Sequence, residues 1–210
     1  MSLGGYLAGL QAGFDALALR PPVAAPDEQA RLRAQARAVH AISAWCLQGA
    51  VPRLRQRMLV GALRGAPGAD AAALANWADA FARHIDGGMR LDAMSTRAQG
   101  LAWRLHAKLN DARVWRARQR DDPWDAGWAL STPPSLRQLQ GRWMPRRATL
   151  VLADAADHAA LRLALTALWQ RHTDFRHPVR WLWVGSGADL PAVAGQLVGR
   201  FSLAPVSGPG

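Results

Sequence analysis

The sequence of 210 residues has very little cysteine, glutamate or lysine, with Cys46, Glu28 and Lys108 as the only examples of each. A single cysteine excludes an internal disulfide framework and a zinc site built from several cysteines. No apolar run reaches the roughly 18 residues that a membrane-spanning helix needs, because arginine interrupts every such stretch. A signal peptide carries Lys or Arg before its apolar part, and the first 19 residues have neither there. We therefore expect a soluble, cytoplasmic protein.

Acidic residues are also scarce compared with basic ones. The chain has 26 Lys and Arg against 15 Asp and Glu, which gives a formal net charge of +11. Such an excess is common in proteins that bind a polyanion, including nucleic acids. Abundant Arg and Ala are equally typical of bacterial proteins from GC-rich genomes, so codon bias also explains part of the charge. The composition leaves both explanations open, while a mean hydropathy of -0.10 indicates a globular chain.

In the first 120 positions, apolar residues recur at three- and four-residue steps, which is typical of amphipathic helices. We expect helices over 3–18, 28–49, from Pro52 through Leu63, from Asp70 to Gly87, and over 91–118. Asp27 and Asp70 are suitable N-caps, and Gly87 is a suitable helix end. We divide this part into a docking helix with its linker at 1–22 and a helical region at 23–120, which should pack as an antiparallel bundle.

The second part of the chain has a different pattern. Residues 121–146 form a connector rich in Trp and Pro, with a helical turn at 135–140, and 147–210 form a small α/β unit. In that unit we expect strands at 148–154, 179–184 and 201–206, separated by helices at 158–172 and 189–200. This order favours a parallel sheet. The fold class is therefore mixed α+β or α/β. The two helices of this unit cannot cover both faces of its sheet, so the N-terminal helices or a partner should cover the remaining face.

One turn in the α/β unit has features of a phosphate site. The letters VGSGAD at 184–189 follow a strand and open a helix, where backbone amides can hold a phosphate. The residues of this candidate ligand site are Asp154, Gly185, Ser186, Gly187 and Asp189. The third glycine of a dinucleotide motif and the Lys-Ser/Thr of a P-loop are missing. Asp154, Asp157 and Asp189 could also form an acidic metal site or supply a general base. Asp157 and Asp189 are equally suited to helix capping, and capping is the interpretation we prefer.

The sequence shows no catalytic or metal-binding constellation. Its six histidines form no recognised metal spacing, and no serine lies in a nucleophile-elbow context. Cys46 lies on the apolar side of its expected helix, where a thiol behaves as a small hydrophobic group. We therefore expect no metal, no cofactor and no catalytic residue.

Arginines gather in three clusters, two of which contain a tryptophan. The residues are Arg31, Arg33, Arg37, Arg53, Arg55 and Arg57 in the first cluster, Arg113, Trp115 and Arg116 in the second, and Arg142, Trp143, Arg146 and Arg147 in the third. Arginine binds phosphates and tryptophan stacks on bases, so these clusters fit a nucleic-acid surface. The same residue types are enriched at the centres of protein interfaces. Both kinds of partner are therefore supported.

The leading hypothesis is a non-catalytic binding or assembly subunit of an intracellular bacterial complex. Its Arg- and Trp-rich surfaces would bind a protein partner or, alternatively, nucleic acid. The second hypothesis is a small nucleotide- or phosphate-binding enzyme whose site lies at the carboxyl ends of the strands. A third is a purely structural chain that docks through residues 3–18. The sequence leaves the oligomeric state open.

Overall fold

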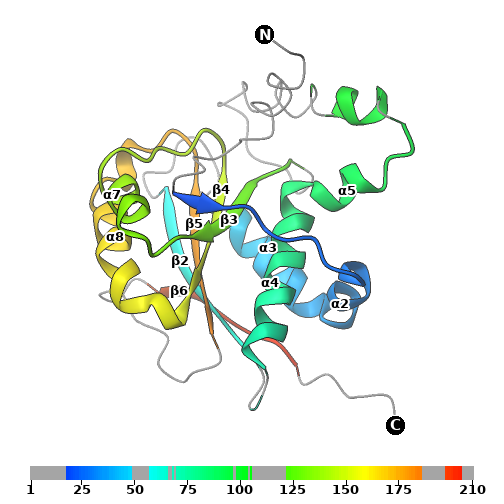
Figure 1. Cartoon of the computed structure of the whole chain (residues 1–210), viewed down its shortest axis with the longest axis horizontal. Helices are drawn as coiled ribbons and strands as arrows, with labels where there is room; N and C mark the ends of the chain where they lie inside the picture. Colours follow the sequence, from blue (N-terminus) through cyan, green and yellow to red (C-terminus); the bar gives the residue numbers. More distant parts are fainter. Residues whose placement is uncertain are drawn as a thin grey trace.

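A computed structural model describes residues 18–48, 57–65, 68, 70–96, 98–103, 105, 122–185 and 197–204, and this part is built around one mostly parallel sheet (Figure 1). Its strands are β1 (Leu19–Arg20), β2 (Met58–Arg64), β3 (Asp125–Ala129), β4 (Thr149–Asp154), β5 (Val179–Gly185) and β6 (Leu197–Ser202). They lie in the order β1-β3-β4-β5-β2-β6. β1 is antiparallel to β3, and the other neighbouring pairs are parallel. No helix in these ranges is long and apolar enough to cross a membrane.

Strand β2 corrects the expectation of a helix from Pro52 through Leu63. Pro52 lies outside the described residues, but Met58–Arg64 is a strand that pairs with β5 on one side and β6 on the other. Met58 and Val60 pack into one core, and Leu59 packs into the core on the opposite face of the sheet. A strand buried on both faces has no polar side, so its apolar run can be mistaken for a helix.

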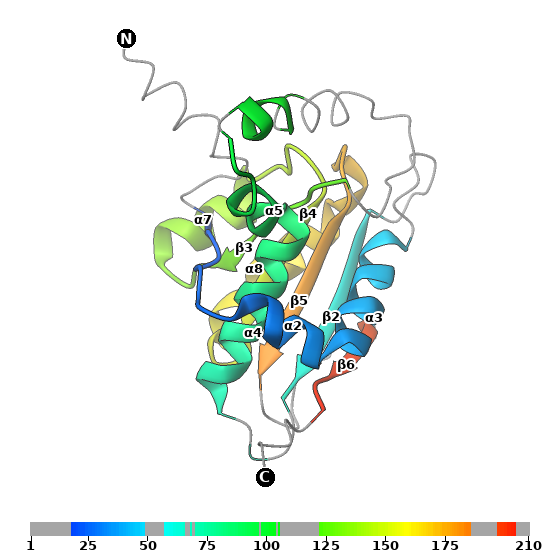
Figure 2. The same cartoon turned by 90° about the vertical axis from the view of Figure 1, so that its right-hand side faces the viewer.

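Helices cover both faces of the sheet, as Figure 2 shows. The first layer contains α2 (Glu28–Ala34), α3 (Ala36–Leu47), α4 (Ala71–Asp86) and α5 (Gly88–Asp92). Residues of α3 and α4, such as Ile42 and Phe81, share one core with Leu150 and Leu182 of the sheet. These helices therefore lie against the sheet, and the antiparallel N-terminal bundle that we expected to pack on it is not confirmed.

The helix expected over 28–49 is interrupted at Gln35. Its side chain donates to the carbonyl of Ala204 (2.9 Å) and accepts from the amide of the same residue (3.0 Å), which links the start of α3 to the segment after β6. Asp27 occupies the N-cap position of α2 but makes no side-chain capping bond. Helix propensity alone contains no signal for this break, because the partner of Gln35 is distant in sequence.

Helix α4 confirms its expected bounds. The carboxylate of Asp70 accepts a hydrogen bond from the amide of Ala72 (3.1 Å), and the helix ends at Gly87 with φ 81°. The helix expected over 91–118 is different: α5 ends at Asp92, residues 98–103 are helical, and 106–121 lie outside the described residues. Residues 3–17 of the expected docking helix lie outside as well.

The other face of the sheet is covered by α7 (Pro133–Gly141) and α8 (His158–Gln170), with short 3-10 turns at Ala155–Asp157 and His172–Asp174. Leu161 and Leu165 of α8 share a core with Trp181 and Trp183 of β5. The strand, helix and strand expected at 148–154, 158–172 and 179–184 are confirmed. Two expectations are wrong: residues 125–129 form a strand within the supposed connector, and the expected helix over 189–200 overlaps strand β6.

Arg180 joins β5 to the end of α3 from a fully buried position. Its Nε donates to the carbonyl of Cys46 (2.9 Å), and its terminal nitrogens donate to the carbonyls of Val179 (3.0 Å) and Gln48. Burial lowers the pKa of Arg180 to about 10, so the guanidinium remains charged at neutral pH. The negative end of the α3 dipole and these carbonyls stabilise that charge.

Candidate functional site

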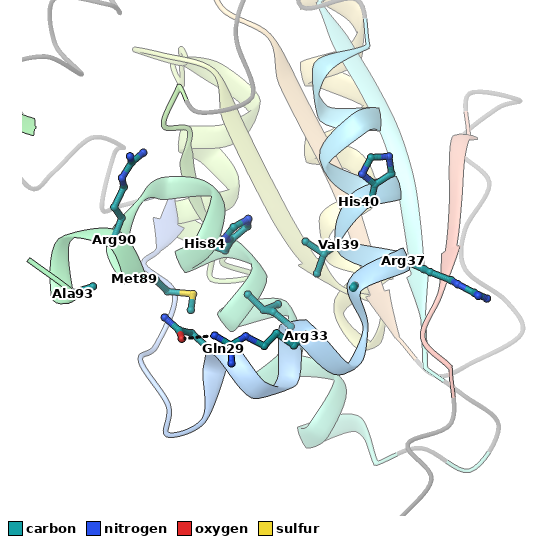
Figure 3. A pocket seen from close by; sticks show the side chains of 11 residues that line it. Gln29, Arg33, Arg37, Val39, His40, His84, Met89, Arg90 and Ala93 are labelled. Carbon is teal, nitrogen blue, oxygen red and sulfur yellow. Dashed lines mark hydrogen bonds between the residues drawn. The ribbon is translucent and has the colours of Figure 1, made fainter.

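A groove of about 960 Å³ lies between α2 and α3 on one side and the α4–α5 junction on the other (Figure 3). The residues that line it are Gln29, Leu32, Arg33, Ala36, Arg37, Val39, His40, His84, Met89, Arg90 and Ala93. They come from two segments that are separated by strand β2 in the sequence. The packing of α2 against α4 brings these segments together.

The floor of the groove is apolar. Leu32 belongs to the core between α2–α4 and the sheet, and Val39 and Met89 pack against that core as partly buried residues. In Figure 3, the side chains of Val39 and Met89 are directed toward the space between α3 and α5. The floor therefore continues the hydrophobic core to the surface, where it can bind apolar side chains of a ligand.

The rim of the groove is basic. Arg33, Arg37 and Arg90 are exposed, and none of the lining residues is acidic. Arg33 donates to Oε1 of Gln29 (3.4 Å), which lies beside it on α2. The rim thus carries several positive charges around the apolar floor, and Figure 3 shows the side chain of Arg37 directed away from Val39 and Met89.

Acidic residues of the same helical layer are paired with Arg83. Its Nε lies 2.9 Å from Oε1 of Glu28, and a terminal nitrogen contacts Oδ2 of Asp92. Burial alone would lower the pKa of Arg83, but the bonds to these two carboxylates raise it. Because Glu28 and Asp92 are paired with Arg83, less of their negative charge acts on the arginines at the rim.

Asp86 ends helix α4 close to this ion-pair network. Its Oδ1 accepts a hydrogen bond from the amide of Gly88 (2.6 Å), which forms the turn into α5. Burial raises the pKa of Asp86 to about 7, although the Gly88 amide and Arg83 act in the opposite direction. Asp86 therefore changes its charge near neutral pH, at the junction that carries Met89 and Arg90.

A second cavity of about 260 Å³ adjoins the groove and shares His84, Met89 and Arg90 with it. Its other lining residues are Ser43, Cys46, Leu47, Ile85, Gly87, Trp103, Pro123 and Trp124. Burial raises the pKa of Cys46 to about 12, so this thiol is not a nucleophile at neutral pH.

The structure separates the predicted arginine clusters. Arg33 and Arg37 line the groove, Arg31 lies on α2 outside its lining, and Arg57 precedes β2. Five predicted residues lie outside the described residues: Arg53, Arg55, Arg113, Trp115 and Arg116. The cluster at 142–147 follows α7, which covers the opposite face of the sheet from the groove.

Trp143 corrects the idea of an exposed stacking platform in that third cluster. It is 2% exposed and packs edge to face on Phe175, with ring centroids 6.2 Å apart. Arg147 lies 3.3 Å from Oδ1 of Asp125, while Arg142 and Arg146 are exposed. A buried indole cannot stack on a base, so this cluster offers arginine alone.

The predicted ligand site falls at the carboxyl edge of the sheet. Asp154 pairs with Val184 across β4 and β5, which places it beside Gly185. Its carboxylate accepts a hydrogen bond from the amide of Ala156 (2.9 Å), a capping role that was expected of Asp157 and Asp189 instead. Asp157 makes no side-chain capping bond. Ser186, Gly187 and Asp189 lie outside the described residues, and the described ones contain no cluster of three metal-binding side chains.

Sequence reasoning missed Met89, Arg90 and His40 as members of one site. His40 lies on an expected helix, whereas Met89 and Arg90 fall between the helix expected to end at Gly87 and the one expected to begin at residue 91, and no motif joins the three. Among the lining residues, only Arg33 and Arg37 were predicted from the sequence, as members of the first arginine cluster. No protein-family model matches the chain, and neither the curated proteins nor the solved structures contain a match. Function is therefore inferred from the chain's own residues.

Proposed function

We propose that this chain is a non-catalytic binding or assembly subunit, and that its groove binds an acidic, amphipathic segment of a protein partner. The observation that carries the proposal is the combination of an apolar floor with a rim of arginines and no acidic lining residue. An amphipathic helix places apolar side chains on one face and charged ones beside it. A groove with this arrangement is a common recognition site for such a helix.

Charge complementarity supports an acidic partner. Arg33, Arg37 and Arg90 are exposed, so carboxylates of the bound segment can pair with them while its apolar residues contact Leu32 and Met89. Arginine suits this role because its planar guanidinium binds a carboxylate in bidentate geometry. Rim charges of this kind mainly accelerate association, so binding should weaken as salt increases.

A protein partner explains the groove better than nucleic acid does. Single-stranded nucleic acid usually needs exposed aromatic side chains on which its bases stack. Trp124, Trp128 and Trp143 are all buried, and the cluster of Arg142 and Arg146 follows a helix on the other side of the sheet. The described arginines therefore do not support one continuous track for a phosphate backbone.

A peptide titration tests the proposal. The probe is a fluorescent, helical peptide with leucine at i, i+3, i+4 and i+7 and glutamate elsewhere, and its anisotropy is followed at low and high salt. We expect saturable binding that falls about tenfold or more when Arg33→Glu and Arg37→Glu are combined. The matched control, Arg142→Glu with Arg146→Glu, changes the net charge equally and should alter affinity by less than about twofold. Equal losses in both double variants, or no binding by the unmodified chain, would overturn the proposal.

A nucleotide- or phosphate-binding function is the second candidate, and the sheet topology favours it. Ligands of parallel sheets usually bind outside the carboxyl ends, where connections leave for opposite faces. Here β2 leads to α4 on one face, while β3 and β4 lead to α7 and α8 on the other. Gly65 and Gly185 stand at the ends of β2 and β5, between these connections.

Two carboxylates at this edge of the sheet make phosphate binding there less favourable. Asp70 caps α4 and Asp154 caps the turn after β4, so each occupies backbone amides that an anion would use. Melting temperatures measured with a panel of nucleotides and Mg²⁺ distinguish the two functions. A concentration-dependent rise with one nucleotide supports this candidate, and a flat response across the panel counts against it.

A further inference from the structure

We infer that the cavity of about 260 Å³ beside the groove receives one aromatic side chain of the same acidic segment. This inference rests on the proposed function, because it adds an anchor to the partner that the groove binds. His84, Met89 and Arg90 line both spaces, so a segment in the groove passes directly over the opening of the cavity.

The walls of the cavity suit an aromatic ring. The partly buried Trp103 contributes aromatic surface, and Leu47 and Ile85 contribute aliphatic surface, while Trp124 lines the cavity with only 2% of its surface exposed. The thioether of Met89 lies between the cavity and the groove and makes favourable contacts with aromatic rings. Buried aromatic anchors in pockets of this kind usually supply much of the affinity of a protein interface.

Trp124 is held in place by two independent contacts. Its backbone amide donates to the carbonyl of Ile85 (3.0 Å), and the guanidinium carbon of Arg180 lies 5.7 Å from the centre of its ring. Arg180 is itself fixed by the carbonyls at the end of α3. The wall is therefore rigid, which reduces the entropy lost when a ring binds against it.

Trp103 also lines the cavity. It packs on Gly87, where an added Cβ would lie 2.4 Å from Cη2 of the indole. Glycine is the only residue type that allows both this contact and the φ of 81° at position 87. The absence of a side chain at this position thus creates room for the indole beside the groove.

Two forms of one peptide test the anchor. The first is the leucine–glutamate peptide with a central tryptophan, and the second carries alanine at that position. We expect the chain to bind the tryptophan peptide about tenfold or more tightly, as for an apolar side chain that enters a pocket. Equal binding of both peptides, with the dependence on Arg33 and Arg37 retained, would overturn the anchor and leave the proposed function standing.

A cavity-filling variant locates the effect. Ser43 lines the cavity but not the groove, so Ser43→Phe should remove the advantage of the tryptophan peptide while the alanine peptide binds as before. The matched control is Ala44→Phe on the exposed side of α3, which should keep the advantage. A full advantage in a folded Ser43→Phe variant contradicts the anchor. If neither peptide binds the unmodified chain, the proposed function is overturned together with the anchor.

Discussion

The indole nitrogen of Trp128 donates a hydrogen bond of 2.7 Å to Oδ1 of Asp79, which joins β3 to α4 inside the core. Both side chains are buried, with exposed fractions of 6% and 7%. Trp128→Phe should lower the free energy of unfolding by about 1–3 kcal/mol, because it leaves a buried carboxylate without its donor. Urea denaturation measures this loss. In an Asp79→Ala background the same substitution should cost clearly less, and an equal cost would show that the bond does not contribute.

The contact between Gly87 and Trp103 predicts that alanine substitution lowers stability unequally at two glycines with similar φ angles. Gly68 and Gly87 have φ of 78° and 81°, but a Cβ at Gly68 would meet nothing within 4 Å. Gly68→Ala should therefore cost about 1 kcal/mol from backbone strain alone. Gly87→Ala should cost more, since Trp103 must also move. Melting temperatures of the two variants decide this, and an equal decrease would contradict the packing of Trp103 on Gly87.

Arg180 predicts a large loss of stability from a conservative change. Arg180→Met keeps most of the side-chain volume but removes the donors to the carbonyls of Cys46 and Gln48. We expect a decrease of about 3 kcal/mol or more in the free energy of unfolding, because several buried carbonyls lose their partners together. Arg180→Lys keeps the positive charge but has fewer donors, so its free energy of unfolding should lie between those of the unmodified chain and of Arg180→Met. An Arg180→Met variant with unchanged stability would mean that water replaces the guanidinium as the donor to these carbonyls.

Asp86 predicts how stability depends on pH. The folded state raises the pKa of Asp86 from 3.8 to about 7, so between these values the folded chain holds a proton that the unfolded chain has released. The contribution of Asp86 to stability is therefore greatest below about pH 4 and is lost as pH rises to about 7. Asp86→Asn removes this dependence and retains an acceptor for the Gly88 amide.

Denaturation curves of the Asp86→Asn variant between pH 4 and pH 8 test this directly. The variant should match the unmodified chain at the acidic end and exceed its stability at pH 8 by an amount on the order of 1 kcal/mol or more. Identical curves throughout this range would show that Asp86 titrates at its ordinary pKa.

The sequence predicted elements whose pattern is local. Asp70 and Gly87 mark the ends of α4 by capping chemistry that lies within the helix itself. The apolar run at 179–184 predicted β5, in which Trp181 and Trp183 alternate along the strand and pack into one core. The runs at 148–154 and 158–172 were equally clear because each has one periodicity.

What the sequence could not predict depends on partners that are distant along the chain. β2 is a strand because β5 and β6 lie on both sides of it, and the break at Gln35 depends on Ala204. The groove arises because α2 packs against α4, which leads into α5, so Arg90 and Met89 join Arg33 only in three dimensions. Trp124, Trp128 and Trp143 had no visible core position because β3 and the cores around it were not foreseen.

The most direct test of the groove uses methionine methyl groups as reporters in the full-length chain. Met89 lines the groove, whereas Met144, which is 46% exposed, follows α7 beyond the opposite face of the sheet. Labelling methionine methyls with ¹³C and adding the leucine–glutamate peptide should shift the Met89 resonance in a saturable manner and leave that of Met144 unchanged. A Met89 resonance that stays fixed while the peptide binds would contradict the assignment of the groove as the partner site.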